Sequence, residues 1–137
     1  MSCILIKNAT IVNEGKTFKG DLLVKDEIIS AIGSPEEMEI PLGTETIDAT
    51  GKLLIPGVID DQVHFREPGL THKGDIFTES RAAAAGGITS FMDMPNTDPQ
   101  TTSMKNLEEK YLLGAEHSLV NYSFYIGATN DNIDDLM

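Results

Sequence analysis

The chain of 137 residues has one cysteine, two arginines and no long apolar run. Because Cys3 is alone, the chain cannot form an internal disulfide bond. No apolar stretch approaches the roughly 18 residues that a membrane-spanning helix needs. The first residues have the pattern of a strand and not of a signal peptide. We therefore expect a cytoplasmic protein that does not enter a membrane.

Basic residues are scarce, because 10 lysines and arginines stand against 22 acidic residues and give a net charge of −12. Nucleic acids and anionic membranes bind basic surfaces, so neither is an expected partner. The acidic residues are spread along the chain, which is typical of a solvated surface. A hydrophobic share of 40% is ordinary for a soluble globular chain.

Residues 1–54 carry short runs rich in Ile, Leu and Val, separated by residues that favour turns. These runs predict strands at residues 3–7, 10–12, 21–24 and 27–32. Turns are predicted at residues 13–15 and 33–35. This part of the chain is therefore expected to form a small β-rich module.

From Leu53 onward, strands alternate with helices. The pattern predicts strands at residues 53–59 or slightly beyond, 88–92 and 119–126, and helices at 75–85 and from 102 or 103 onward. Gly86 and Gly87 end the first helix. One face of the second helix is predicted to consist of Met104, Leu107, Tyr111 and Ala115. Such alternation indicates parallel βα units and an α/β fold.

Residues 130–137 have the pattern of a capped helix start with acidic residues in the first turn. A helix that begins so close to the last residue buries little and satisfies few of its own hydrogen bonds. A closed barrel of eight strand–helix units needs roughly 250 residues. We therefore expect residues 1–137 to be the N-terminal fragment of a longer protein.

The most informative segment is IDDQVHFREPG at residues 59–69, which follows a predicted buried strand. Side chains at positions i and i+2 of a strand point to the same face, so Gln62, His64 and Arg66 are predicted to project together. A neutral imidazole is a natural zinc ligand. A guanidinium binds a carboxylate at two points. The segment therefore predicts a site at the carboxyl end of the strand.

This segment and the sequence MPNT at residues 94–97 together resemble the class I dihydroorotases of the amidohydrolase superfamily. The resemblance covers essentially the whole chain. It implies the N-terminal portion of a (β/α)8 TIM-type barrel, with residues 55–137 as its first three units. Residues 1–54 would be part of a small β-sandwich. The implied reaction is reversible, zinc-dependent hydrolysis of the cyclic amide of dihydroorotate to N-carbamoyl-L-aspartate in pyrimidine biosynthesis.

The resemblance also implies roles for individual residues. Arg66 and Asn96 would hold the carboxylate of the substrate, and His64 would bind one of one or two zinc ions. Asp60 and Asp93 would orient the metal site through hydrogen bonds. The general base and further ligands are expected on strands outside this chain, so residues 1–137 alone are expected to be inert. The complete enzyme is expected to be a homodimer.

Gln62 departs from the family pattern, because it occupies the position of the first metal-binding histidine. An amide oxygen is a weak zinc ligand beside imidazole. Three interpretations are open: a single metal where relatives hold two, weak ligation by Gln62, or a non-catalytic scaffold that assembles with aspartate transcarbamoylase. The presence of His64, Arg66 and Asn96 favours an active enzyme. An amidohydrolase for allantoin or a hydantoin is a further alternative.

Several of these residues also have a purely structural interpretation. Asn96 lies in a string that favours turns. Arg66 has three possible ion-pair partners, which are Glu67, Asp60 and Asp61. Pro68 and Gly69 are expected to shape the loop. The other two histidines are expected to be solvated; they are His72 and His117.

Overall fold

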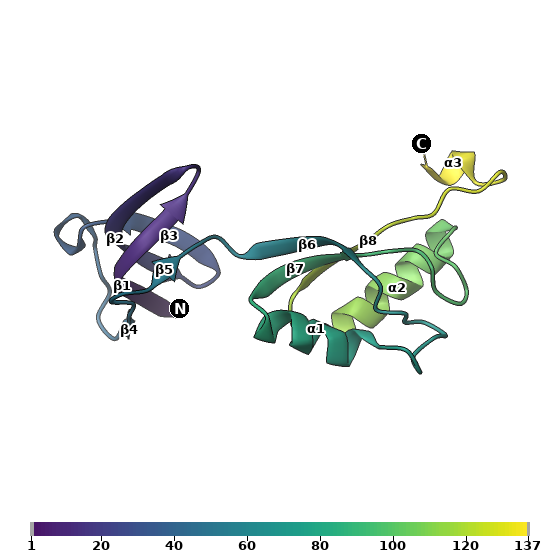
Figure 1. Ribbon diagram of the computed structural model, residues 1–137, viewed down its shortest axis with the longest axis horizontal. Helices are drawn as coiled ribbons and strands as arrows, with labels where there is room; N and C mark the ends of the chain where they lie inside the picture. The colour runs from purple at the N-terminus through teal and green to yellow at the C-terminus, as the bar shows by residue number, and fades with distance from the viewer. Residues whose placement is uncertain (1, 137) are drawn as a thin grey trace. The chain divides into compact units, whose positions relative to one another are not determined.

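The computed structural model describes residues 2–136. The chain forms two compact units that divide between Pro56 and Gly57. The first unit is built from strands, and the second combines a parallel sheet with helices (Figure 1). No helix within residues 2–136 is long and apolar enough to cross a membrane.

The first unit is a sheet with the strand order β3-β2-β1-β4, and β5 also pairs with β1. The strands are β1 (Cys3–Asn13), β2 (Lys16–Lys25), β3 (Ile28–Gly33), β4 (Glu45–Asp48) and β5 (Leu53–Leu54). A 3₁₀ turn, η1, spans Pro35–Glu37. The pairs β1–β2 and β2–β3 are antiparallel, whereas β4 and β5 run parallel to β1.

The prediction of two separate strands at residues 3–7 and 10–12 was wrong, because β1 is continuous. The interruption in the sequence pattern marks a register shift against β2 between Ile6 and Ala9. Asn8 lies in this irregularity with a φ of 61°. Its backbone N–H donates to Asp21 Oδ1 at 2.9 Å, so the irregular backbone keeps a hydrogen bond.

The second unit contains a parallel sheet with the order β6-β7-β8. The strands are β6 (Val58–Val63), β7 (Ile88–Asp93) and β8 (Asn121–Phe124), and the helices are α1 (Ile76–Ala85), α2 (Met104–His117) and α3 (Ile133–Leu136). The predicted strand at 53–59 is in fact split between β5 and β6, which belong to different sheets. Pro56 contributes to this break because it has no N–H for a strand ladder.

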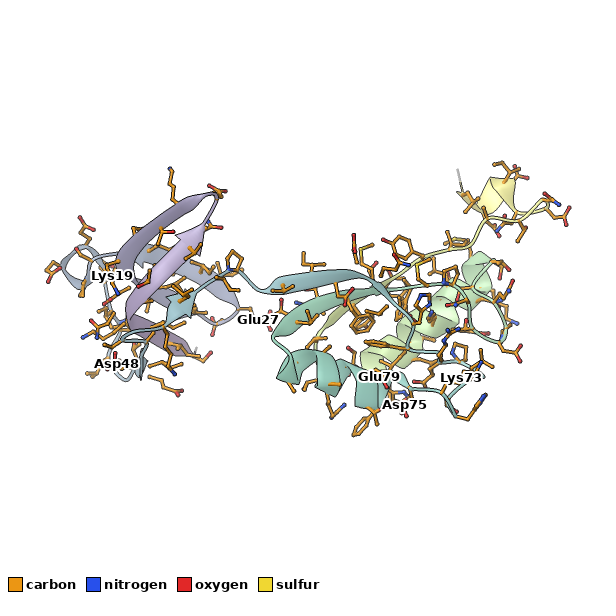
Figure 2. All side chains as sticks on the ribbon, in the orientation of Figure 1. Lys19, Glu27, Asp48, Lys73, Asp75 and Glu79 are labelled. Atoms are coloured by element: carbon orange, nitrogen blue, oxygen red, sulfur yellow. The ribbon has the colours of Figure 1, made fainter. Side chains whose placement is uncertain are left out.

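Hydrogen bonds to side chains define the starts of α1 and α2. The prediction that Gly86 and Gly87 end α1 is confirmed, whereas Asp75, predicted as the first residue of that helix, is its cap. Asp75 caps α1 by accepting the N–H of Thr78 at 2.7 Å, and Figure 2 shows Asp75 at the beginning of this helix. The helix ends at Gly86. Ser103 caps α2 by accepting the N–H of Asn106 at 3.2 Å. Local hydrogen bonds of this kind favour helix starts wherever the sequence places them.

The predicted packed face of α2 was only partly right. Leu107 packs against the core, but Met104 and Tyr111 are 46% and 40% exposed. The buried residues of α2 are Lys110 and Gly114. A Cβ on Gly114 would lie 2.6 Å from the ring of Tyr122, so the missing side chain lets the helix approach β8 closely.

The core of the second unit joins the sheet to both helices, which lie on the same side of the sheet (Figure 1). Phe91 is 1% exposed and Ile76 is fully buried. Phe65 and Phe91 have ring centroids 4.5 Å apart, and Phe91 and Phe124 have centroids 6.3 Å apart. This aromatic cluster joins residues of β7, β8 and the segment that follows β6.

Candidate active site

Because β6, β7 and β8 are parallel, their carboxyl ends lie at one edge of the sheet. A cavity of about 460 Å³ opens there, lined by residues 61–62, 94–95 and 125–127. The hydroxyl of Tyr125 donates to the carbonyl oxygen of Asp61 at 3.1 Å and so links the ends of β6 and β8. The cavity lies at the end of the strands where the site was predicted.

His64 and Asn96 are in direct contact, although 32 residues separate them in the sequence. His64 Nδ1 lies 3.0 Å from Asn96 Oδ1. An amide oxygen only accepts hydrogen bonds, so Nδ1 carries a proton in this contact, and in the neutral imidazole the lone pair is then on Nε2. The exposed imidazole of His64 is therefore held in the tautomer that offers Nε2 to a ligand.

Arg66 also reaches Asn96, because its Nη1 donates to the backbone oxygen of Asn96 at 3.4 Å. The prediction that alternation along a strand points Arg66 to the same face as His64 was wrong. The strand β6 ends at Val63, and Arg66 lies in the following loop with a φ of 71°. Within residues 2–136, the guanidinium forms no ion pair with a carboxylate. The alternative interpretation of Arg66 as the ion-pair partner of Glu67 was therefore wrong.

Glu67 instead joins the loop after β6 to α1 and α2. Its Oε2 accepts the N–H of Ile76, the first residue of α1, at 2.9 Å. Its Oε1 lies 3.2 Å from His117 Nδ1 in the last turn of α2. His117 is therefore not the solvated histidine that was predicted, whereas His72 is exposed as expected.

Gln62 lines the cavity and is exposed. Its backbone N–H donates to Asp60 Oδ1 at 3.2 Å, so the hydrogen bond of Asp60 goes to its own strand and not to His64. Val63 packs against the aromatic core, and Gln62, its neighbour in the strand, points away from that core.

Asp93 forms a buried ion pair that the sequence pattern did not predict. Its Oδ2 lies 2.8 Å from Lys110 Nζ, and both side chains are almost completely buried. Its Oδ1 accepts the N–H of Phe65 at 3.0 Å. Burial lowers the pKa of Lys110, while the hydrogen bond and the charge of Asp93 oppose that change. One signal was available: Lys110 follows Leu107 by three positions on the packed side of α2.

The residues around His64 are too few to hold a zinc ion by themselves. Within residues 2–136, no three side chains of His, Cys, Asp or Glu come together as metal ligands. A catalytic zinc ion takes about three protein ligands and a water molecule. His64 fits as one ligand through Nε2, and the Gln62 amide is a weak candidate for another. A complete zinc site therefore requires ligands beyond those of this chain.

In sequence, the chain matches a family model and proteins named dihydroorotase. A family model described as "Dihydro-orotase-like" matches residues 51–135. A dihydroorotase from Lactobacillus leichmannii is 40% identical over 134 residues, which are 96% of this chain and 30% of that protein. A dihydroorotase from Methanosarcina acetivorans is 39% identical over 136 residues, or 99% of this chain and 28% of that protein.

Solved structures agree with the sequence comparison. The L-hydantoinase (dihydropyrimidinase) of Arthrobacter aurescens matches 99% of this chain and 30% of its own, with a TM-score of 0.91 and 33% identity. A D-hydantoinase matches 98% of this chain with a TM-score of 0.80 and 31% identity. The chain thus has the mixed α/β fold of the matching part of these proteins and spans about 30% of their length. Because the family model covers more than half of the residues, the chain belongs to the dihydro-orotase-like family.

Proposed function

We propose that this chain is part of a cyclic amidohydrolase that hydrolyses dihydroorotate reversibly to N-carbamoyl-L-aspartate. Relatives named dihydroorotase and hydantoinase support a cyclic amide as the substrate. One observation carries the choice of substrate: Arg66 and His64, from the loop after β6, both contact Asn96 in the loop after β7.

The convergence matters because it leaves a guanidinium free to bind an anion. Within residues 2–136, the guanidinium of Arg66 donates to the backbone oxygen of Asn96 and forms no ion pair, so its charge is not neutralised by a carboxylate there. A planar guanidinium binds a carboxylate through two hydrogen bonds. Dihydroorotate carries a carboxylate on its ring, whereas hydantoin and allantoin do not. The site therefore favours dihydroorotate.

Zinc belongs to this proposal, with one or two ions per site. A bound zinc ion would polarise the amide carbonyl and lower the pKa of a water molecule to about 7. His64 would hold the ion through Nε2, while Asn96 keeps the imidazole in the required tautomer. Further ligands and the general base would come from residues outside this chain.

The test is turnover of dihydroorotate, hydantoin and allantoin by the full-length protein, with its zinc content measured. Arg66→Ala should raise KM for dihydroorotate roughly ten- to a hundredfold, which corresponds to about 1.5–3 kcal/mol. Arg81→Ala is the matched control, because Arg81 is exposed on α1 and its recorded hydrogen bonds go to backbone oxygens of Phe77 and His117. Unchanged KM in Arg66→Ala would contradict carboxylate binding.

Gln62 supports a second candidate function, because an amide at this position weakens the metal site. In that case the full-length protein would be a non-catalytic scaffold for aspartate transcarbamoylase. It would then bind no zinc, turn over no dihydroorotate and co-sediment with the transcarbamoylase. The active enzyme should instead sediment as a homodimer that contains zinc.

A further inference from the structure

Lys110 occupies an unusual position for a lysine. It lies in the middle of α2, on the side that faces the sheet, and its side chain is 0% exposed. Its ammonium lies 2.8 Å from Asp93 Oδ2 and donates to the carbonyl oxygen of Met94 at 2.9 Å. It also lies 5.0 Å from the centre of the Phe124 ring. A buried ammonium with this many partners is held in one place.

The partners of Lys110 lie at the carboxyl ends of the strands. Asp93 is the last residue of β7 and Phe124 is the last residue of β8. The second oxygen of Asp93 accepts the N–H of Phe65, which follows β6 by two residues. The backbone oxygen of Asp93 accepts the N–H of Tyr125 at 3.0 Å. The Lys110–Asp93 pair therefore contacts all three strand ends at once.

Two of these contacts are close in the sequence to residues of the candidate site. Phe65 lies between His64 and Arg66, and Met94 precedes Asn96 by two residues. Burial of two charges is costly, and apolar residues of similar size often stabilise a core equally well. Hydrogen bonds in a buried network are directional, so they hold neighbouring loops at defined distances, whereas apolar packing does not.

We propose that Lys110 is a positioning residue that acts through Asp93 and Met94 to hold His64 and Arg66 against Asn96. The position of His64 and Arg66 depends on these contacts alone, whereas an effect of Lys110 on turnover also rests on the proposed function. One measurement therefore reports the position of His64, and a second reports the turnover of dihydroorotate.

The experiment compares the full-length wild-type protein with Lys110→Met, which keeps an unbranched side chain, shorter by one atom, and removes the ammonium. The first measurement is the ¹⁵N NMR signal of His64 Nδ1, recorded after metal is removed by chelation and assigned with His64→Gln. Without a metal ion on Nε2, this signal reports the tautomer held by Asn96. The second is the separation of KM from kcat for dihydroorotate. Lys105→Met is the matched control, because Lys105 is 81% exposed on the same helix.

We expect Lys110→Met to shift the His64 signal toward a mixture of tautomers and to raise KM roughly ten- to a hundredfold. Lys105→Met should match the wild type in both measurements. A folded Lys110→Met protein with the wild-type His64 signal would overturn the inference. An unchanged KM for dihydroorotate would also overturn it, because Arg66 would then still be in place.

The variant with both Asp93→Asn and Lys110→Met keeps the test decisive if Lys110→Met alone does not fold. It leaves no unpaired charge in the core and keeps an acceptor oxygen for the Phe65 N–H. The same changes are expected in it, and wild-type behaviour would overturn the inference. If the wild-type protein turns over no dihydroorotate, the proposed function fails, and the His64 signal alone decides the role of Lys110.

Discussion

Asp98 donates its backbone N–H to the carbonyl oxygen of Pro68 at 3.1 Å, which joins the loop after β7 to the loop after β6. Gly69, which follows Pro68, has a φ of +80°, and a Cβ on Gly69 would overlap the carbonyl group of Asp98. The prediction that Pro68 and Gly69 shape this loop is therefore confirmed. The loops that carry Arg66 and Asn96 meet where no side chain fits between them.

Gly69→Ala should therefore separate these two loops. Gly87→Ala is the control, because Gly87 has a φ of +87° but a Cβ there would have no neighbour within 4 Å. Both variants carry the cost of a left-handed alanine, about 1–2 kcal/mol. The steric overlap at Gly69 should add about 1–3 kcal/mol to the loss of unfolding free energy, measured in urea on the full-length protein. Equal losses in the two variants would contradict this contact.

Glu67→Ala should destabilise the start of α1, because Glu67 is 8% exposed and accepts the N–H of Ile76. A buried donor that loses its partner costs about 1–3 kcal/mol. Glu67→Gln keeps an acceptor oxygen and should lose less. Hydrogen exchange of the Ile76 amide measures the effect, and equal exchange rates in the two variants would show that this hydrogen bond is unimportant.

Asp75 makes the stability of α1 depend on pH at the acidic end. Hydrogen bonds from the backbone and side chain of Thr78 lower the pKa of Asp75 below its ordinary value of 3.8. The cap therefore contributes fully above pH 3.8 and is lost as the pH falls through the lower folded-state pKa. Asp75→Ala should cost about 1 kcal/mol at neutral pH. Chemical denaturation from pH 6 downward should show this difference shrinking, and a constant difference would contradict the assignment.

Lys110→Met should lower the unfolding free energy by about 3–5 kcal/mol, because Asp93 is left charged and buried without a cation. The variant with both Asp93→Asn and Lys110→Met should lose less. Urea denaturation of the three proteins at neutral pH compares these losses. A larger loss in the double variant would contradict the buried ion pair.

The buried ammonium of Lys110 also predicts a pH dependence in alkaline solution. Because burial lowers the pKa of Lys110 below its ordinary value of 10.5, the unfolded chain binds the proton more tightly than the folded chain. The unfolding free energy contributed by this group therefore rises with pH toward 10.5. The difference between wild type and Lys110→Met should grow in the same direction, as measured by urea denaturation at increasing pH. A difference that shrinks would contradict the sign of the shift.

Where local contacts decide the structure, the sequence predicted it well. Asp75 and Ser103 cap their helices through residues three positions later, and Gly86 ends α1 as expected. The boundaries of α1 and β7 are therefore correct to within one residue. The prediction of parallel strands was also correct, and it places the carboxyl ends of β6, β7 and β8 at one edge of the sheet.

By itself, the sequence determined the order of strands and helices, the helix caps and the two motifs that mark the site, because these depend on residues a few positions apart. Only the tertiary structure decided that β5 and β6 belong to different sheets and that Asn96 contacts both His64 and Arg66. It alone also placed Lys110 in the core. A lysine is buried only when a partner is available to its ammonium, and Asp93 becomes that partner when α2 folds back onto the sheet.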